Sequence, residues 1–179
     1  YNIYSHLKIQ GTIGTDINNM NFQDYIARTT PGKSAGQLQE SIFQNRTLNA
    51  ELLALYNNQF GDFDVNATLG GNIYKVDNKT NILTGLGQQM KDVIAIMNYQ
   101  EQSIQQNTYK KQINSIYGSA SIGYDHTYYL EGTIRGDKSS TLPTSNNTYV
   151  YPSVSASWVF SEYLKNKNII NYGKFRASW

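Results

Sequence analysis

The sequence predicts an all-β protein: an antiparallel meander of about seven or eight strands that forms part of a transmembrane β-barrel. Three observations lead to this prediction. Apolar and polar residues alternate with period 2 in several segments, nearly all charges in those segments fall on one face, and short and long connections alternate along the chain. A wall with hydrocarbon on one side and water on the other requires this pattern.

The clearest stretch, residues 112–162, predicts three strands joined first by a tight turn at 125–127 and then by a polar loop at 138–148. The apolar face of the middle strand consists of Tyr128, Leu130, Gly132 and Ile134. The opposite face carries every charge of that strand and consists of Tyr129, Glu131, Thr133, Arg135 and Asp137. Strands at 115–124 and 149–160 alternate in the same way, so one face of this predicted sheet is free of charge.

The same alternation predicts strands upstream at 7–17, 42–56 and 63–74, and a final strand that begins at Gly173. Arg46 is an exception, because it falls on the apolar side of its strand. A cation at the bilayer midplane costs roughly 2–4 kcal/mol, so Arg46 is expected at the membrane rim. The final strand has about seven residues, fewer than the ~9–11 that cross a bilayer, which predicts a piece of a larger barrel.

Connections of different length alternate along this meander. Two tight connections, 57–62 and 125–127, fall on one side together with 161–172, whereas the two longest, 18–39 and 77–111, fall on the other side with 138–148. Outer-membrane barrels have short periplasmic turns and long outer loops, so the long segments are predicted to be extracellular. Loops of this length are usually functional, which makes 18–39 and 77–111 candidates for contact with a partner or substrate.

Apolar residues at helical spacing in the second of these loops predict a short amphipathic helix, which either packs on its own loop or docks a partner. These residues are Leu86, Met90, Val93, Ile94 and Met97.

The composition fits one domain without a disulfide framework or a catalytic thiol. The chain has 179 residues, no cysteine, and 15 basic against 13 acidic residues, for a net charge of +2. That balance gives no reason to expect nucleic acid as a partner. No run of about eighteen apolar residues occurs, so no transmembrane helix is predicted, whereas a barrel strand needs apolar residues only at alternate positions.

Several segments, in the same order along the chain, resemble the barrel of SusC/RagA-type TonB-dependent outer-membrane transporters. They are SIYGSASIGYDHTYYLEGTIRGDKSS from Ser115, YVYPSVSASWVFSE from Tyr149 and YGKFRASW from Tyr172. The first contains the R-x-D-x-S-S stretch of that family, formed here by Arg135, Asp137, Ser139 and Ser140. The second is a Tyr-Pro-Ser-Val strand ending in Trp-x-x-Ser-Glu, and residues 52–72 resemble the family's hairpin around a Phe-Gly-Asp turn.

The resemblance implies that residues 1–179 are part of a TonB-dependent receptor barrel of about 22 strands in the outer membrane of a Gram-negative bacterium. It implies active uptake of glycan or peptide fragments, with a SusD-like surface lipoprotein over the extracellular loops. TonB would supply energy through an N-terminal part, and the plug domain and TonB box are not expected within these residues. The implied partners are that lipoprotein, TonB, outer-membrane lipid and an oligosaccharide or peptide substrate, without a cofactor.

Two sets of residues are candidates for function on this wall. Candidates for contact with plug or substrate on the polar face are Glu51, Tyr129, Glu131, Arg135, Asp137, Lys174 and Arg176. Alternatively, these charges form a cross-strand network in which Arg135 and its neighbouring carboxylates satisfy one another. Aromatic residues near the strand ends predict an interfacial girdle of Tyr56, Phe63, Tyr124, Tyr128, Trp158 and Phe160.

No catalytic or metal-binding constellation is predicted, so the chain is not expected to be an enzyme. The two histidines, His6 and His126, are far apart in sequence and lack the spacing of a metal site or a triad. Two rival functions remain open. One is a passive porin-type channel, which shares this wall but needs no plug or lid. The other is a soluble β-sandwich module that binds carbohydrate and buries its apolar face against a second layer of protein.

Overall fold

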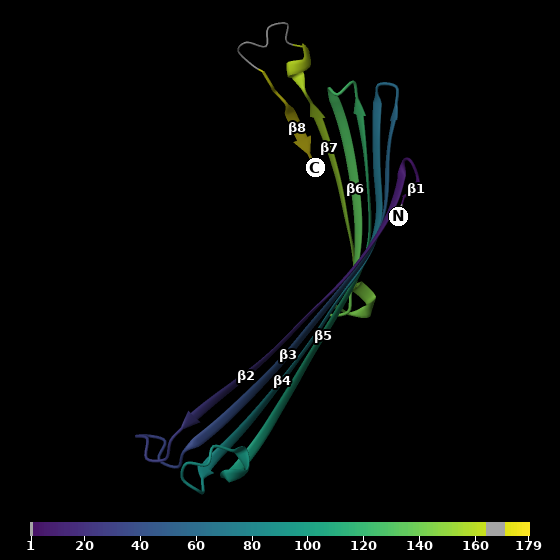
Figure 1. Ribbon diagram of the computed structural model, residues 1–179. Helices are drawn as coiled ribbons and strands as arrows, with labels where there is room; N and C mark the ends of the chain where they lie inside the picture. Colours follow the sequence, from purple (N-terminus) through teal and green to yellow (C-terminus); the bar gives the residue numbers. More distant parts are fainter. Residues whose placement is uncertain (1, 164–170) are drawn as a thin grey trace. The chain divides into compact units, whose positions relative to one another are not determined.

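Across residues 2–163 and 171–179, a computed structural model shows eight strands in one sheet, each paired with its neighbour in the chain (Figure 1). The strands are β1 (Asn2–Tyr4), β2 (Leu7–Ile26), β3 (Gln37–Phe60), β4 (Phe63–Gln88), β5 (Tyr99–Tyr124), β6 (Tyr128–Ser139), β7 (Thr148–Trp158) and β8 (Phe175–Ser178). Short 3₁₀ helices are η1 (Ile96–Asn98), η2 (Thr144–Asn146) and η3 (Phe160–Tyr163). The predicted all-β antiparallel meander is confirmed.

The chain forms two compact units. Unit 1 comprises Tyr1–Gly14, Asn49–Tyr74 and Gln112–Trp179, and unit 2 comprises Thr15–Leu48 and Lys75–Lys111. Strands β2 to β5 contribute residues to both units, whereas β6, β7 and β8 belong to unit 1 alone. No helix in the part of the chain that the structure describes is both long and apolar enough to cross a membrane.

The register of unit 1 keeps the predicted apolar residues on one face. Strand β5 pairs with β6 so that Ile122 lies opposite Leu130, and β6 pairs with β7 so that Leu130 lies opposite Ala156. Two residues further along, Ala120 and Gly132 face each other in the same way. We call the face with Leu130 the outer face and the face with Arg135 the inner face. Because side chains alternate along a strand, this register fixes both faces for the whole of β6.

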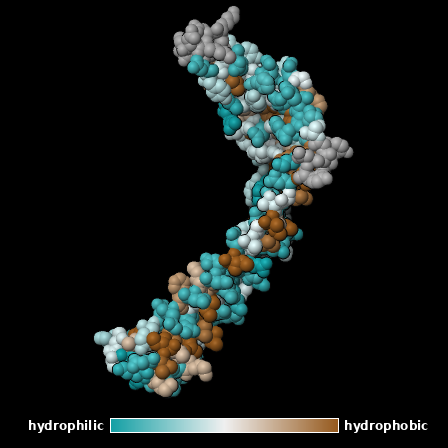
Figure 2. All heavy atoms as spheres, viewed as in Figure 1, coloured by the Kyte–Doolittle hydropathy of each residue, from teal (hydrophilic) through white to brown (hydrophobic). Residues whose placement is uncertain are grey.

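The outer face is uncovered. Its apolar side chains are 54% exposed at Leu130, 56% at Ile134, 44% at Val154 and 41% at Trp158. Among the described residues, the buried apolar side chains are Leu38, Tyr99 and Val159, so the sheet has no second layer packed against this face. Figure 2 shows hydrophobic side chains at the surface among hydrophilic ones. A water-soluble sandwich would bury such a face, so this arrangement contradicts that rival.

Two tight turns in unit 1 lie side by side. Gly61 pivots the β3–β4 hairpin with φ +60°, and Asp125 and His126 pivot the β5–β6 hairpin with φ of 49° and 50°. Left-handed backbone is easiest for glycine and is tolerated by Asp and His more than by most residues. The Asp125 amide donates to the carbonyl oxygen of Asp62 at 2.9 Å, which links the two hairpins. The tight turns predicted within 57–62 and at 125–127 are therefore confirmed.

The predicted long loops are shorter than expected, because the strands continue into them. Strand β2 ends at Ile26 and β3 begins at Gln37, so the loop predicted at 18–39 is reduced to 27–36. Strand β4 ends at Gln88 and β5 begins at Tyr99, so the segment predicted at 77–111 is reduced to 89–98. These extensions are rich in Asn, Gln, Lys and Thr and lack apolar alternation, but their backbone groups pair along the sheet without it.

The predicted amphipathic helix is wrong. Leu86 lies within β4, and the only helical turn in 89–98, a segment the structure describes in full, is η1 at Ile96–Asn98. The helical spacing of Met90, Val93 and Ile94 arises by chance in an irregular connection. The alternation of connection lengths nevertheless remains: 61–62 and 125–127 alternate with the longer 27–36, 89–98 and 140–147. Most of the connection predicted at 161–172 lies outside the described residues.

Candidate functional site

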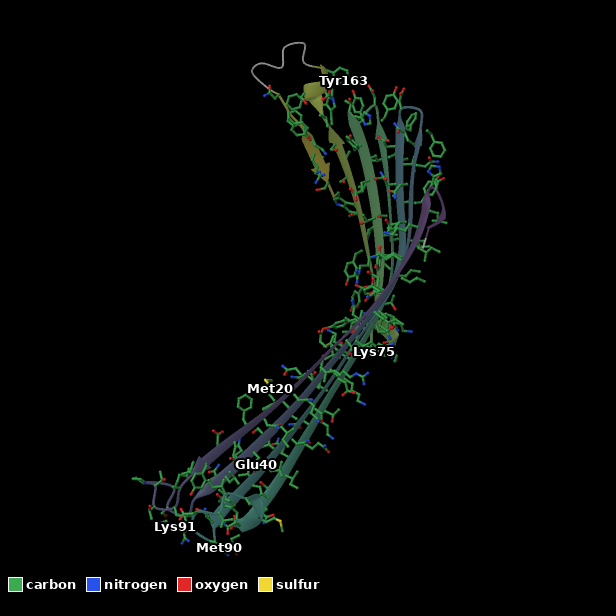
Figure 3. The ribbon with its side chains drawn as sticks, in the orientation of Figure 1. Met20, Glu40, Lys75, Met90, Lys91 and Tyr163 are labelled. Atoms are coloured by element: carbon green, nitrogen blue, oxygen red, sulfur yellow. The ribbon has the colours of Figure 1, made fainter. Side chains whose placement is uncertain are left out.

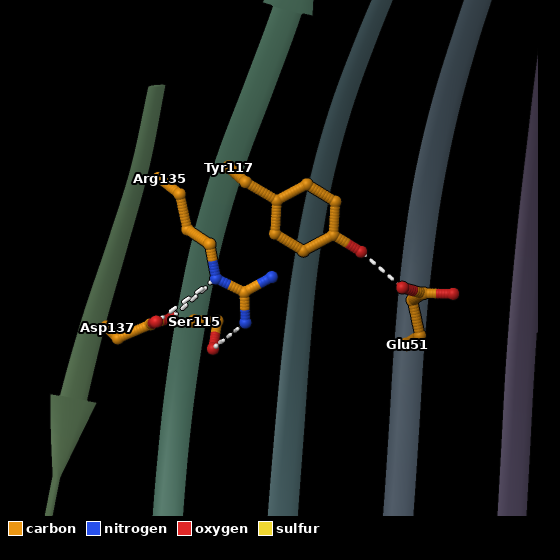
Figure 4. A network of polar contacts seen from close by, with 5 residues as sticks. All are labelled: Glu51, Ser115, Tyr117, Arg135 and Asp137. Carbon is orange, nitrogen blue, oxygen red and sulfur yellow. Dashed lines mark hydrogen bonds and ion pairs between the residues drawn. The ribbon is translucent and has the colours of Figure 1, made fainter. Parts of the chain in front are cut away.

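The inner face of unit 1 brings together three of the predicted polar-face candidates. Arg135 and Asp137 lie on β6 and Glu51 on β3, and between them β5 contributes Ser115 and Tyr117. Figure 4 shows these five side chains pointing toward one another across the strands. In the β5–β6 register, Tyr117 lies directly opposite Arg135 and Ser115 directly opposite Asp137. We call these five residues the inner cluster.

Arg135 holds the inner cluster together. Its Nε donates to Asp137 Oδ1 at 2.9 Å and Oδ2 at 3.1 Å, and its Nη2 donates to Ser115 Oγ at 3.1 Å. Its guanidinium carbon lies 5.3 Å from the centre of the Tyr117 ring, a cation–π distance. The Tyr117 hydroxyl donates in turn to the Glu51 carboxylate. Charges and donors of these five residues thus satisfy one another from β3 to β6.

A glycine makes room for the central ring. The Tyr117 ring lies over Gly70 of β4, where an added Cβ would stand 2.4 Å from Tyr117 Cε2 and 2.7 Å from Leu53 Cδ2. Sequence reasoning left Tyr117 and Ser115 out of the candidate set, because neither is charged and both types are abundant here. Their position on the polar face two residues apart, opposite Asp137 and Arg135, was the available signal.

A second aromatic–cation contact lies nearer the turns. Lys174 Nζ is 5.2 Å from the centre of the Tyr129 ring, and the Tyr129 hydroxyl donates to the His126 carbonyl at 3.1 Å. This brings the predicted candidates Tyr129 and Lys174 together. Glu131 and Arg176 join neither group: Glu131 lies opposite Ser155, and Arg176 lies opposite Ser157 in the β7–β8 register.

The described part of the inner face offers groups that can bind a polar solute. Its side chains offer guanidinium and hydroxyl donors, carboxylate acceptors and aromatic rings, of which Arg135 is about half exposed. Among the described residues no group of three or more His, Asp or Glu side chains could hold a metal ion. His126 faces the Asp64 carboxylate at 3.3 Å, at an exposed turn. Hydrogen bonding and stacking with a polar solute are what this surface can provide.

The predicted girdle residues gather at the turn end of unit 1. Phe63 and Tyr124 have ring centres 4.8 Å apart, and Trp158 lies 6.5 Å from Tyr128 and 6.0 Å from Phe160. Two further rings, Phe175 and Tyr163, join this group at 6.3 Å from Trp158 and 6.4 Å from Tyr128 respectively. Tyr56 instead accepts a hydrogen bond from Asn58 Nδ2 at 3.1 Å.

The two longer connections of unit 2 lie against each other. Gly87 and Gln88 amides donate to the carbonyls of Gly36 and Ala35 at 3.2 and 2.9 Å, and Arg28 Nη1 donates to the Gln89 carbonyl at 3.2 Å. Met90 and Lys91 lie at this end of the unit (Figure 3). The 27–36 and 89–98 connections therefore form one joint surface, in which Met90 is 61% and Met97 87% exposed.

The connection 89–98 is held by a buried amide. Asn98 Oδ1 accepts from the Met90 amide at 2.9 Å, and Asn98 Nδ2 donates to the carbonyls of Met90 at 2.7 Å and Val93 at 2.8 Å. Gln88, also buried, donates to the Val93 carbonyl and accepts from the Tyr25 hydroxyl. The predicted partner-binding loop is therefore a structured connection with exposed apolar side chains.

Comparison with known proteins supports the architecture. No protein-family model matches the chain, and neither does any curated protein. Among solved structures, the RagAB peptide transporter matches at 14% identity and a TM-score of 0.87, over 98% of this chain and 20% of that chain. The RagAB peptide importer matches at 15% identity in its "closed-closed" state (TM-score 0.87) and its "open-open" state (TM-score 0.86), each over 99% of this chain and 20% of that chain.

These identities are low, so the likeness concerns the fold. The chain spans about a fifth of the length of the RagAB chains that it matches. The resemblance to SusC/RagA-type barrels that the sequence indicated is thus confirmed in three dimensions: residues 1–179 have the fold of one segment of the RagAB transporter chain.

Proposed function

We propose that residues 1–179 form part of the barrel wall of an outer-membrane transporter in a Gram-negative bacterium. The observation that carries this proposal is the single-layer sheet of unit 1, with an uncovered apolar outer face and a polar, internally bonded inner face. Lipid is the medium that makes an uncovered apolar face stable. The aromatic rings at the turn end fit the interfacial girdle of such a wall.

The more specific proposal is a SusC/RagA-like, TonB-dependent importer. The support is the fold likeness to a peptide importer known in closed and open states. A peptide is accordingly the first substrate class to test, and an oligosaccharide the second. A SusD-like surface lipoprotein over the outer connections and TonB on the periplasmic side are the proposed partners. The inner-face residues Glu131, Tyr129, Lys174 and Arg176 are proposed to face plug or substrate, while Arg135, Asp137 and Glu51 stabilise the wall.

The wall can be tested by measuring which medium each face meets. Single cysteines would be placed in the full-length protein at two adjacent pairs, Leu130 and Glu131 on β6 and Val154 and Ser155 on β7, and labelled with bimane. In bilayers with brominated acyl chains, the outer-face probes at Leu130 and Val154 should be quenched by bromine. The inner-face probes at Glu131 and Ser155 should instead be quenched by aqueous iodide, because neighbouring residues point to opposite faces.

Each outer-face probe is compared with a probe at the next residue of the same strand. Local unfolding of that strand would expose both probes alike, so it cannot produce a difference in quenching between them. Absence of bromine quenching at both Leu130 and Val154 would overturn the membrane wall and with it the transporter.

Energy coupling separates an importer from a passive channel. Cells that express the full-length protein should take up a fluorescent oligopeptide, and uptake should stop in a strain without TonB or after the proton gradient is collapsed. Uptake that continues under both conditions would make the protein a porin-type channel, although the wall itself would stand.

A further inference from the structure

Cations gather on one face of unit 2, at the sequence positions that directly follow the apolar alternation. Along β4 the outer-face series Leu69, Gly71 and Ile73 continues as Lys75, Asp77 and Lys79. Along β3 the corresponding change places Arg46 after Leu48. The sequence predicted that Arg46 stands at a membrane rim, and its neighbours in unit 2 can now be named.

Arg46 lines a hollow of about 290 Å³ on unit 2. The other lining residues are Ile17, Asn19, Gln44, Asn45, Asp77 and Lys79. Two cations and four amide or aliphatic side chains thus surround a single carboxylate. This volume is at the small end of ligand pockets, so it suits a headgroup fragment and not a whole lipid.

The hollow has an excess of positive charge. Asp77 already faces another cation, because Lys110 Nζ lies 3.7 Å from its Oδ2. Within the described residues, neither the Arg46 guanidinium nor the Lys79 ammonium has a hydrogen-bond or ion-pair partner. Amides of Asn19 and Gln44 add neutral donors. Guanidinium, ammonium and amide donors around one hollow suit the oxygens of a phosphate group.

We propose that this hollow binds the phosphorylated headgroup of an outer-leaflet lipid. The inference rests on the proposed function, since that function places the outer face of the strands against lipid and the long connections outside the cell. The hollow lies on the face that meets lipid in the proposed function, directly past the end of the apolar alternation, so a lipid headgroup is the anion held closest to it. Basic side chains at a membrane surface attract anionic lipid in this way.

The test uses the purified full-length protein in detergent and three probes: lipid A with its phosphates, the same lipid dephosphorylated, and inorganic phosphate. The doubly substituted variant Arg46→Gln/Lys79→Gln should bind phosphorylated lipid A roughly thirty-fold more weakly, because each basic side chain near an anionic surface contributes about a five-fold factor. Wild-type binding should also weaken with added NaCl.

The matched control is Lys33→Gln/Lys91→Gln, which removes the same charge from the connections of unit 2. Figure 3 shows Lys91 at the loop end of the unit and Lys75 at the opposite end. This control should bind like the wild type. Equal binding by both double variants, equal binding of the dephosphorylated lipid, or absence of any salt effect on the wild type would overturn the lipid site. The lipid site would also be overturned if inorganic phosphate bound as tightly as phosphorylated lipid A.

Failure here is distinguishable from failure of the proposed function. A protein that fractionates with the outer membrane but binds both forms of lipid A equally loses only this site. A protein absent from the outer membrane loses the transporter, whatever its affinity for lipid A in detergent.

Discussion

Three glycines of the sheet decide where neighbouring aromatic rings can lie. The Tyr117 ring covers Gly70, the Tyr129 ring covers Gly123 and the Tyr99 ring covers Gly85, each within about 3 Å of where a Cβ would stand. A ring over a glycine shields backbone that would otherwise be bare and gives the tyrosine a fixed direction. For Tyr117 that direction delivers the hydroxyl to Glu51 and the ring face to Arg135.

Gly70→Ala should therefore destabilise the wall by about 1–3 kcal/mol, since the new methyl group would displace Tyr117 and Leu53. Gly71→Ala is the control, because its Cβ would meet only the Ser115 carbonyl oxygen at 3.7 Å, an ordinary contact. Urea unfolding of the full-length protein in bilayers measures both. In a Tyr117→Ala background the cost of Gly70→Ala should shrink, and equal costs at positions 70 and 71 would contradict the account.

Tyr99 carries a buried hydroxyl that, among the described residues, has no hydrogen-bond partner. Burial, assisted by nearby Tyr25, raises the pKa of Tyr99 above the usual 10.0. Tyr99→Phe should stabilise unit 2 by about 1 kcal/mol, because it removes a desolvated polar group without changing shape. A fluorophore on Met97→Cys reports local unfolding in urea.

The same phenol gives a pH dependence whose sign follows from the raised pKa. Below pH 10 the Tyr99 phenol is neutral in both the folded and the unfolded protein. Above pH 10 the phenol of the unfolded protein ionises first, which stabilises the unfolded state relative to the folded one. The wild type should thus lose stability as pH rises above 10, and Tyr99→Phe should lose less. An identical alkaline decline in both proteins would show that Tyr99 is not buried as described.

At the scale of elements, the strands are longer than a bilayer requires. Strand β4 has 26 residues, whereas about 9–11 suffice to cross a membrane. Its apolar alternation ends at Ile73, and the sequence identified the strand only to that point. Apolar alternation marks the part of the strand that has one apolar face, while the remaining residues are held by backbone pairing, which leaves no periodic signal in the side chains. The strand starts at Phe63 and Tyr128 were predictable, because tight turns fix them.

The connection 89–98 depends on Asn98, the residue that replaces the predicted helix as its organiser. Asn98→Ala would leave the Met90 amide and two carbonyls without their partner, at a local cost of about 2–3 kcal/mol. A local cost of that size should make hydrogen exchange of the amides in 89–98 about thirty to a hundred and fifty times faster. Exposed Met97→Ala should leave exchange unchanged, and unchanged exchange in Asn98→Ala would refute the role of this amide.

At the scale of the whole molecule, part of the inner cluster was visible in the sequence. Arg135 and Asp137 stand out because charges two residues apart on a strand share a face. Glu51 was assigned to the same face, but its link through Tyr117 depends on the pairing of β3, β4 and β5, which no local pattern encodes. The Lys174–Tyr129 contact likewise depends on where β8 aligns with β7. The sequence of a single strand predicts which face each side chain lies on. Predicting which side chains contact one another also requires the register between strands.

The medium against the outer face determines how the whole sheet responds to a charge. Leu130 is 54% exposed on that face, and a soluble protein would accept Leu130→Arg at little cost. Against lipid the same change should cost about 1–3 kcal/mol, because arginine must be desolvated two residues below the girdle residue Tyr128; the cost would reach roughly 2–4 kcal/mol at the bilayer midplane. Ser155→Arg is the matched change on the inner face, where the new cation stands opposite Glu131 and should be neutral or slightly stabilising. Urea unfolding of the full-length protein in bilayers measures the difference, and equal stabilities of the two variants would mean that hydrocarbon does not contact Leu130.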